Sequence, residues 1–378
     1  MFLPSHPELS PHAASPVEWW YVQGRLVLAD GTARAIMLAV FRGPIGGETP
    51  AMAFIAIHDG SGAKAFRRSV ISPGMIALIE ATTDRVGAAE TPAFVLRILK
   101  HAFRRDARAR VSAGLCVAGN DAVLRTSPFE LTWLDIVLRE DDDAVRLTFD
   151  AEGQTYDLTL RPCAGWSDLA PGNIPSNLGI AGYRSCPRMA VTGRAGDIDL
   201  TGSVWFDRQW GDESQIASVR HNRIVLTGWD WFAINLENGL DLMLYRPRDP
   251  RSGAVLPGFG AVWSGGQWRP LGAGFDAQPI AWFESPVTGH RYPTCWTLDI
   301  PDAGLSLRLE AETAQGEIPI YGPMGWNWQS PARVEGQLDR APVRGSGWLE
   351  LNGYGYPLTL RTQMRFWTAY LRALVTQR

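Results

Sequence analysis

The chain of 378 residues is long enough for two hydrophobic cores, because single domains seldom grow beyond about 250–300 residues. Its apolar fraction of 46% and charged fraction of 20% are those of an ordinary globular protein. The formal net charge of −3 argues against nucleic-acid binding, which needs a broadly basic surface. The 16 tryptophans stand out, since such large flat side chains serve stiff cores or line apolar ligand pockets.

The cysteines and the start of the chain argue against further classes of protein. The four cysteines lie far apart, and none has the spacing of a zinc site or a disulfide framework, so we expect no metal. The first sixteen residues lack the pattern of a secretory signal. No stretch approaches the roughly 20 apolar residues of a transmembrane segment. We therefore expect a cytoplasmic protein.

Two tryptophan-rich segments are each expected to open a β-hairpin. The first begins at Glu18–Tyr21 and reaches the dipeptide Asp30-Gly31, and the second begins at Trp229–Phe232 and reaches Asn238-Gly239. Asp-Gly and Asn-Gly between apolar runs are strong hairpin signals, because both central residues of the turn need positive φ angles. The two segments predict that one structural unit occurs twice in the chain.

The first copy is expected to carry a helical insertion at about residues 72–123. Within it, Thr91–Arg110 has apolar side chains on one helical face and basic side chains on the other. A basic face of this kind is typical of a solvated helix, and peripheral contact with a membrane is the alternative.

A second repeat supports the duplication. Val191–Asp207 contains Val, Gly, Gly-Ser, Trp and an acid at positions that recur in Val334–Glu350, always 143 residues later (Val191 against Val334). Short strands and Gly/Pro turns dominate elsewhere, which is typical of closed or sandwiched antiparallel sheets. We therefore predict a mostly β fold of two tandem β-barrel or sandwich domains, at residues 1–215 and 216–378. Gln363–Leu374 is expected to form a C-terminal helix.

Asp230 is the first candidate for chemistry. Strand alternation puts it on the same face as Phe232, Ile234 and Leu236. A carboxyl group on an apolar face is either paired with a buried base or held protonated by desolvation. When the two opening segments are aligned with Tyr21 against Phe232, Asp230 takes the place of Trp19, so this acid is expected to distinguish the copies.

Four further polar residues have weaker claims. Asp207 and Arg208 lie between aromatic residues, and we expect Arg208 to cover a barrel end and to pair with Glu18 or Asp207. A secondary acid or base is the alternative role for these three residues. His58 follows an apolar run, where a histidine is more often a core residue than a base.

The aromatic candidates are expected to line a ligand pocket or to pack in the cores. Two exposed tryptophan-rich strands would leave a large apolar patch, so we expect these residues to be largely buried. They are Trp20, Tyr21, Trp229 and Trp231. His290 and Tyr292 belong to a predicted loop over a barrel mouth, and Tyr292 is a further candidate for substrate binding.

Together, several motifs resemble those of the AttH-like/carotenoid 1,2-hydratase family of two lipocalin-like domains. The motifs are Glu18–Tyr21, Trp205–Gly211, Gly228–Phe232, Leu242–Arg246 and Ser285–Gly289. The resemblance implies a ligand pocket at or between the domains and no organic cofactor. It also implies that the Trp-Asp-Trp acid of the hydratases matches Asp230. The opening motif Glu18–Tyr21 is closer to that of the AttH-like branch of the family, most of whose members have no known reaction.

The resemblance and the residues favour a cofactor-independent enzyme that acts on a hydrophobic isoprenoid, polyene or polyketide. In the hydratase hypothesis, a protonated Asp230 donates a proton to an alkene, aromatic faces stabilise the cation, and water captures it. In the pericyclase hypothesis, as in the Diels–Alderases of the family, the pocket holds a folded polyene. A non-catalytic carrier of lipid or pigment is the third alternative.

Overall fold

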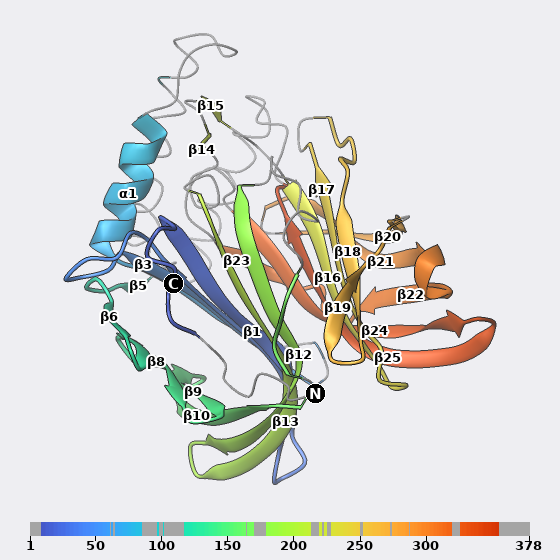
Figure 1. Cartoon of the computed structure of the whole chain (residues 1–378), viewed down its shortest axis with the longest axis horizontal. Helices are drawn as coiled ribbons and strands as arrows, with labels where there is room; N and C mark the ends of the chain where they lie inside the picture. The colour runs from blue at the N-terminus through green and yellow to red at the C-terminus, as the bar shows by residue number, and fades with distance from the viewer. Residues whose placement is uncertain are drawn as a thin grey trace. The chain divides into compact units, whose positions relative to one another are not determined.

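The computed structural model describes residues 9–354 except 61, 63–64, 85–96, 98–100, 102–116, 164, 170–178, 213–218, 221–222, 225–227, 250–251, 273, 287 and 320–325. The described chain is mostly β-structure and divides into two compact units (Figure 1). The first unit consists mainly of the chain up to Val225, and the second mainly of the chain from Leu226. The predicted C-terminal helix lies outside the described residues, as does nearly all of the predicted helix Thr91–Arg110.

One large sheet forms the first unit, and a single described helix, α1 (Pro73–Asp84), falls within the predicted insertion. The strands are β1 (Val17–Leu28), β2 (Ala33–Arg42), β3 (Ala51–Asp59), β4 (Ala65–Ile71), β5 (Val117–Ala118), β6 (Val123–Thr126), β7 (Phe129–Trp133), β8 (Ile136–Asp141), β9 (Ala144–Ala151), β10 (Gln154–Pro162), β11 (Ser167–Asp168), β12 (Ile180–Ala195) and β13 (Ile198–Gly211). Their order in the sheet is β5-β4-β3-β2-β1-β13-β12-β10-β9-β8-β7-β6, with β11 beside β12. All described pairings are antiparallel except the short one between β4 and β5. A separate two-stranded ladder joins β14 (Val219–Arg220) to β15 (Arg223–Ile224).

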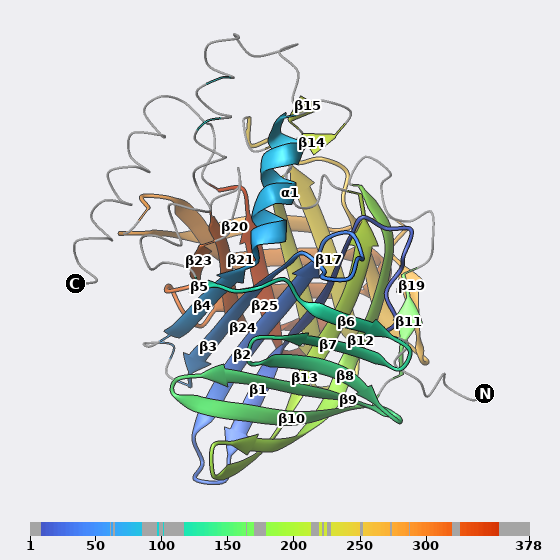
Figure 2. The same ribbon diagram turned by 90° about the vertical axis from the view of Figure 1, so that its left-hand side faces the viewer.

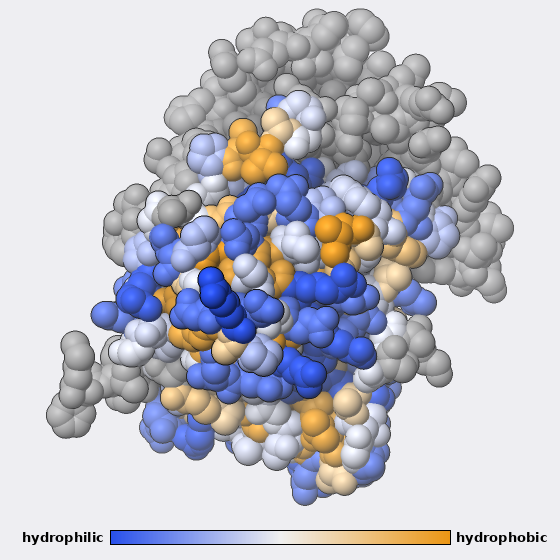
Figure 3. Space-filling view, turned by 90° about the vertical axis from the view of Figure 1, so that its right-hand side faces the viewer, coloured by the Kyte–Doolittle hydropathy of each residue, from blue (hydrophilic) through white to orange (hydrophobic). Residues whose placement is uncertain are grey.

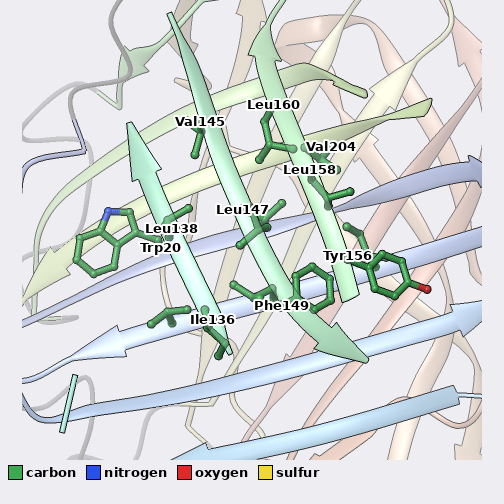
Figure 4. Packing of buried hydrophobic residues seen from close by; sticks show 14 of the residues in the cluster. Trp20, Ile136, Leu138, Val145, Leu147, Phe149, Tyr156, Leu158, Leu160 and Val204 are labelled. Atoms are coloured by element: carbon green, nitrogen blue, oxygen red, sulfur yellow. The ribbon is translucent and has the colours of Figure 1, made fainter. Parts of the chain in front are cut away.

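The sheet of the first unit curls into a half-barrel, with β6–β10 crossing over β1–β3 (Figure 2). Alternate residues of β1 point into the core, among them Trp20, Val22 and Leu26, all fully buried. Trp20 packs against Phe129 of β7, with ring centroids 5.1 Å apart. Figure 4 shows the same core from close by, with the aliphatic side chains of β8–β10 pointing toward it.

The second unit is a ten-stranded sheet. Its strands are β16 (Gly228–Leu236), β17 (Asp241–Arg248), β18 (Phe259–Ser264), β19 (Gln267–Pro270), β20 (Asp276–Glu284), β21 (Arg291–Ile300), β22 (Leu305–Ala311), β23 (Glu317–Pro319), β24 (Trp326–Leu338) and β25 (Ala341–Asn352), with a 3-10 turn at Pro301–Ala303. The order is β19-β18-β17-β16-β25-β24-β22-β21-β20, and β23 pairs with β24. The core contains Phe232, Ile234 and Leu236, as the alternation predicts. On the surface that carries β20–β22, hydrophilic residues surround smaller apolar patches (Figure 3).

The duplication predicted from the sequence is confirmed. Val191 pairs with Gly202 between β12 and β13, and Val334 pairs with Gly345 between β24 and β25, so the matched segments have the same register in two different sheets. Both predicted hairpins also occur, with φ angles of 85° at Gly31 and 90° at Gly239. The expectation that both central residues have positive φ is wrong, because Asp30 and Asn238 do not have it and the glycine alone supplies the left-handed residue of each turn. The mostly β fold with two separate sheets is therefore as the sequence predicts.

No described helix is long and apolar enough to cross a membrane. Within the described ranges, no three His, Cys, Asp or Glu side chains are grouped as metal ligands would be.

Candidate functional site

Asp230 is fully buried and bound by two arginines on the inner face of the second unit. Arg246, directly opposite on β17, donates to Oδ2 through Nε (2.9 Å) and Nη2 (2.7 Å). The Arg248 Nε lies 3.5 Å from Oδ1, and the Tyr354 hydroxyl donates to Oδ1 at 2.6 Å. The sequence left two alternatives for Asp230, pairing with a buried base or protonation by desolvation. The structure has the first, with Arg246 and Arg248 as the bases.

The cross-strand register corrects the alignment of Asp230 with Trp19. Leu26 pairs with Gly202, and Leu236 pairs with Gly345, the two equivalent glycines of the repeat. Counted from these pairs, Asp230 is level with Trp20. A shift of one residue moves a side chain to the other face of a sheet, so matching Asp230 to the outward-facing Trp19 is wrong.

The inner acid is in fact common to both units. Glu18 lies on the same face as Trp20 and directly opposite Arg42, as Asp230 lies opposite Arg246. Glu18 lies two residues closer to the N-terminus than Trp20, the residue that is level with Asp230. The two copies therefore share a buried acid–arginine pair in the first hairpin, at positions two residues apart.

Glu18 anchors the N-terminal segment of the first unit. Its Oε2 accepts from Arg42 Nη2 at 2.7 Å, and its Oε1 accepts from Arg208 Nε at 2.7 Å. The His12 backbone NH donates to Oε2 at 2.9 Å, and the His12 ring stacks on Trp210. Arg42, Arg208 and the His12 hydrogen bond hold the pKa of Glu18 below its usual value, although burial opposes the shift. These contacts join β1, β2 and β13 to the segment at His12, so Glu18 has a structural role at this end of the sheet.

A second buried acid, Glu317, lies near Asp230 in the second unit. It accepts from Tyr292 Oη at 2.9 Å, from Thr288 Oγ1 at 2.5 Å and from the Ser285 hydroxyl. The Tyr292 ring packs against Tyr354, with centroids 5.5 Å apart, and Tyr354 in turn binds Asp230. Burial and Glu317 raise the pKa of Tyr292 well above its usual value, so its hydroxyl stays protonated. The network joins the predicted residues Asp230 and Tyr292 on the inner side of one sheet. The prediction that Tyr292 belongs to a loop is wrong, because it lies in β21 and is 1% exposed.

Glu350 lies on the opposite, outer face of the same sheet and has a different environment. It is half-buried, and its Oε1 accepts from Asn327 Nδ2 at 2.9 Å and from Trp229 Nε1 at 3.3 Å. Burial raises the pKa of Glu350, and the hydrogen bonds from Asn327, Gln329 and Trp229 oppose the shift without offsetting it. A carboxyl with a raised pKa keeps its proton at higher pH and can act as a general acid.

Aromatic rings form a row beside Glu350. Trp229 stacks on Tyr245 with centroids 6.2 Å apart, and Tyr245 stacks on Phe259 at 5.1 Å. Burial, Glu350 and Asp230 raise the pKa of Tyr245 far above its usual value, so the phenol stays neutral. Trp229 and Tyr245 are half-buried, as is Glu350, so ring faces and the acid occupy a partly accessible region of one face.

The repeat counterpart of Glu350 in the first unit is Asp207, which also accepts a hydrogen bond from a tryptophan, here one on its own strand. Asp207 accepts from Trp205 Nε1 at 2.5 Å, from Tyr183 Oη at 2.6 Å and from the Ser185 hydroxyl. Ser185 lies directly opposite Asp207, as Gln329 lies opposite Glu350. Asp207 is 3% exposed, so of the two outer acids Glu350 is the more accessible.

The other predicted residues divide between the two faces. Trp20 is in the core of the first unit, whereas Tyr21 and Trp231 are on the outer faces of their sheets; all three are buried, as predicted, and Trp229 is half-buried. His58 is 1% exposed, and burial and Arg67 lower its pKa to about 4, so the ring is neutral at pH 7.

Sequence reasoning missed Glu350, Asn327 and Tyr354 as site residues. Glu350 was visible only as the last acid of the repeat, and the repeat itself was the signal. Asn327 and Tyr354 carried no signal, because they contact the acids across strands whose register the sequence does not show.

Comparisons with known proteins agree with the architecture. A model of the family described as AttH-like matches residues 4–354. A crystal structure described as an AttH from Nitrosomonas europaea has 19% identity and a TM-score of 0.62, covering 94% of this chain and 97% of that one. Kievitone hydratase from Nectria haematococca has 14% identity and a TM-score of 0.61, covering 93% and 92%. No curated protein matches the sequence. Since the family match spans nearly the whole chain, the protein belongs to the AttH-like family.

Proposed function

We propose that this protein is a cofactor-independent hydratase that adds water to a carbon–carbon double bond of an apolar substrate, with Glu350 as the proton donor. The observation that carries the proposal is a half-buried carboxyl with a raised pKa beside a row of aromatic rings. The substrate class that fits these surroundings is an isoprenoid, polyene or polyketide with a trisubstituted alkene.

In the proposed reaction, Glu350 transfers its proton to the less substituted alkene carbon, and the π electrons form the new C–H bond. The other carbon becomes a tertiary cation. The ring face of Trp229 that is turned away from Tyr245 can stabilise such a cation by about 2 kcal/mol when water is excluded. Tyr245 supports the Trp229 ring from its other side and is itself stacked on Phe259. Water then forms the C–O bond, and its spare proton returns to the Glu350 carboxylate, so the acid is regenerated.

Asp230 fits this scheme as a positioning residue. Arg246 and Arg248 hold its carboxyl in place through ion pairs at 2.7 and 3.5 Å. Arg248 also donates to the backbone oxygen of Asn352 at 2.6 Å, two residues after Glu350. Asp230 can therefore fix the strand that carries the acid, and Tyr292, Tyr354 and Glu317 support the same end of the sheet.

The fold similarity to kievitone hydratase supports a hydratase-type reaction. A test is to incubate the protein with 2-prenylphenol, farnesol and lycopene in H2¹⁸O. We expect a product heavier by one labelled water. A product with the mass of its substrate would instead indicate a cyclase. Tight binding of all three without turnover would indicate a carrier. Either of these results would contradict the proposal.

A further inference from the structure

We propose that Asn327 and Asn352 hold the attacking water beside Glu350, so that different side chains of one site supply the proton and orient the water. The inference rests on the proposed hydration reaction and assigns a further step to the same site.

The first observation is a pair of amide oxygens without partners. The Oδ1 atoms of Asn327 and Asn352 are buried, and neither has a hydrogen-bond partner among the described residues. A buried acceptor without a partner destabilises a protein, so two of them beside one acid require a reason. Asn327 and Asn352 lie directly opposite each other on β24 and β25, where Cβ atoms are about 4.5–5.5 Å apart.

Both amides belong to the Glu350 site. Asn352 shares a strand face with Glu350, because residues two positions apart point to the same side. Asn327 uses its Nδ2 to donate to Glu350 Oε1 at 2.9 Å, which orients the amide and leaves Oδ1 available. Arg248 fixes the backbone of Asn352 through the 2.6 Å hydrogen bond to its carbonyl.

The chemistry of two acceptors fits a water molecule. Water donates two hydrogen bonds, and a bound water usually has two to four polar partners. Two amide oxygens that accept both of its hydrogens leave an oxygen lone pair free to attack the cation. When the C–O bond has formed, the protonated oxygen loses one proton to the Glu350 carboxylate, and the product keeps the hydroxyl.

The test separates protonation from water capture. The probe is 2-prenylphenol in D2O, and the variant is Asn352→Leu, because Asn327 also contacts Glu350. A cation that water does not capture loses a proton and returns to alkene, now labelled with deuterium. We expect hydration to fall about tenfold or more, which corresponds to the loss of a hydrogen bond, while deuterium enters the recovered alkene at least as fast as with the wild type, because cations that are not captured return to alkene.

Continued exchange into the alkene also shows that the variant is folded, and Asn352→Ala provides a second variant of smaller volume. Gln23→Leu is the matched control, because Gln23 of the first unit is 1% exposed with both amide atoms unpaired among the described residues. It should change neither rate. Equal losses of hydration and exchange in Asn352→Leu would overturn the water-binding role and leave the hydratase proposal standing. No deuterium in any wild-type product or alkene would overturn both.

Discussion

At the scale of single residues, Asp230 and Glu350 of the second unit show how much the partners of a carboxyl group decide its role. Alternation along one strand correctly placed Asp230 among Phe232, Ile234 and Leu236. It could not show Arg246 and Arg248, because these come from the next strand and meet the acid only through the hairpin register. Among the described residues no arginine shifts the pKa of Glu350, and burial dominates there.

Asp230→Asn is expected to destabilise the second unit. Removing one member of a buried ion pair leaves the other charge uncompensated, at a cost of about 3–5 kcal/mol. Urea unfolding of the variant checks this value. Asp276→Asn, which changes an exposed acid of the same unit, should alter the unfolding free energy by less than about 0.5 kcal/mol. If both variants are as stable as the wild type, the ion pair does not hold the fold.

At the scale of elements, the hairpins and the repeat were predictable because their signals are local. Asp30-Gly31 and Asn238-Gly239 mark the two turns, and in each the glycine supplies the positive φ angle. The repeat glycines have a physical reason that the sequence does not show. A Cβ atom at Gly202 would lie 2.2 Å from the Arg25 carbonyl oxygen, and one at Gly345 would lie 2.2 Å from that of Asn235. Alignment of the opening strands failed by one residue, because no such local signal fixes strand pairing.

Gly202→Ala and Gly345→Ala should therefore each destabilise the protein by about 1–3 kcal/mol, because neighbouring backbone must move to admit the methyl group. Gly47→Ala is the control, since a Cβ atom there would have nothing within 4 Å. Thermal unfolding of the three variants compares them. Equal melting temperatures for all three would show that the close approach of the strands carries no energetic weight.

At the scale of the whole molecule, the duplication accounts for the fold and for the paired acids, but not for their differences. Each unit has an inner acid bound by arginines and an outer acid that accepts from a tryptophan. Composition, turns and repeats predicted the two sheets. They could not single out the outer face of the second unit, because its accessibility depends on packing around Glu350.

Each unit also contains a buried histidine, which predicts acid sensitivity. Burial lowers the pKa of both His58 and His290 from 6.5 to about 4. Below pH 6.5 the unfolded chain binds protons that the folded protein excludes, so stability is complete above pH 6.5 and declines as the pH falls toward 4. Each ring accounts for about 3 kcal/mol of this loss.

Urea unfolding between pH 7 and pH 4 measures the effect. His58→Asn and His290→Asn should each flatten part of the pH dependence. A slope that neither variant changes would assign the acid sensitivity to other groups.

In the proposed reaction Glu350 supplies the proton, and the variant Glu350→Gln removes it. Glutamine keeps an oxygen that can accept from Asn327 and Trp229 but has no transferable proton. The measurement is deuterium addition to 2-prenylphenol in D2O, with Glu310→Gln as an exposed control in the same unit. We predict that Glu350→Gln unfolds at nearly the wild-type temperature and adds deuterium at least about a hundredfold more slowly, the usual contribution of a general acid. A Glu350→Gln protein that adds deuterium at the wild-type rate would contradict the account.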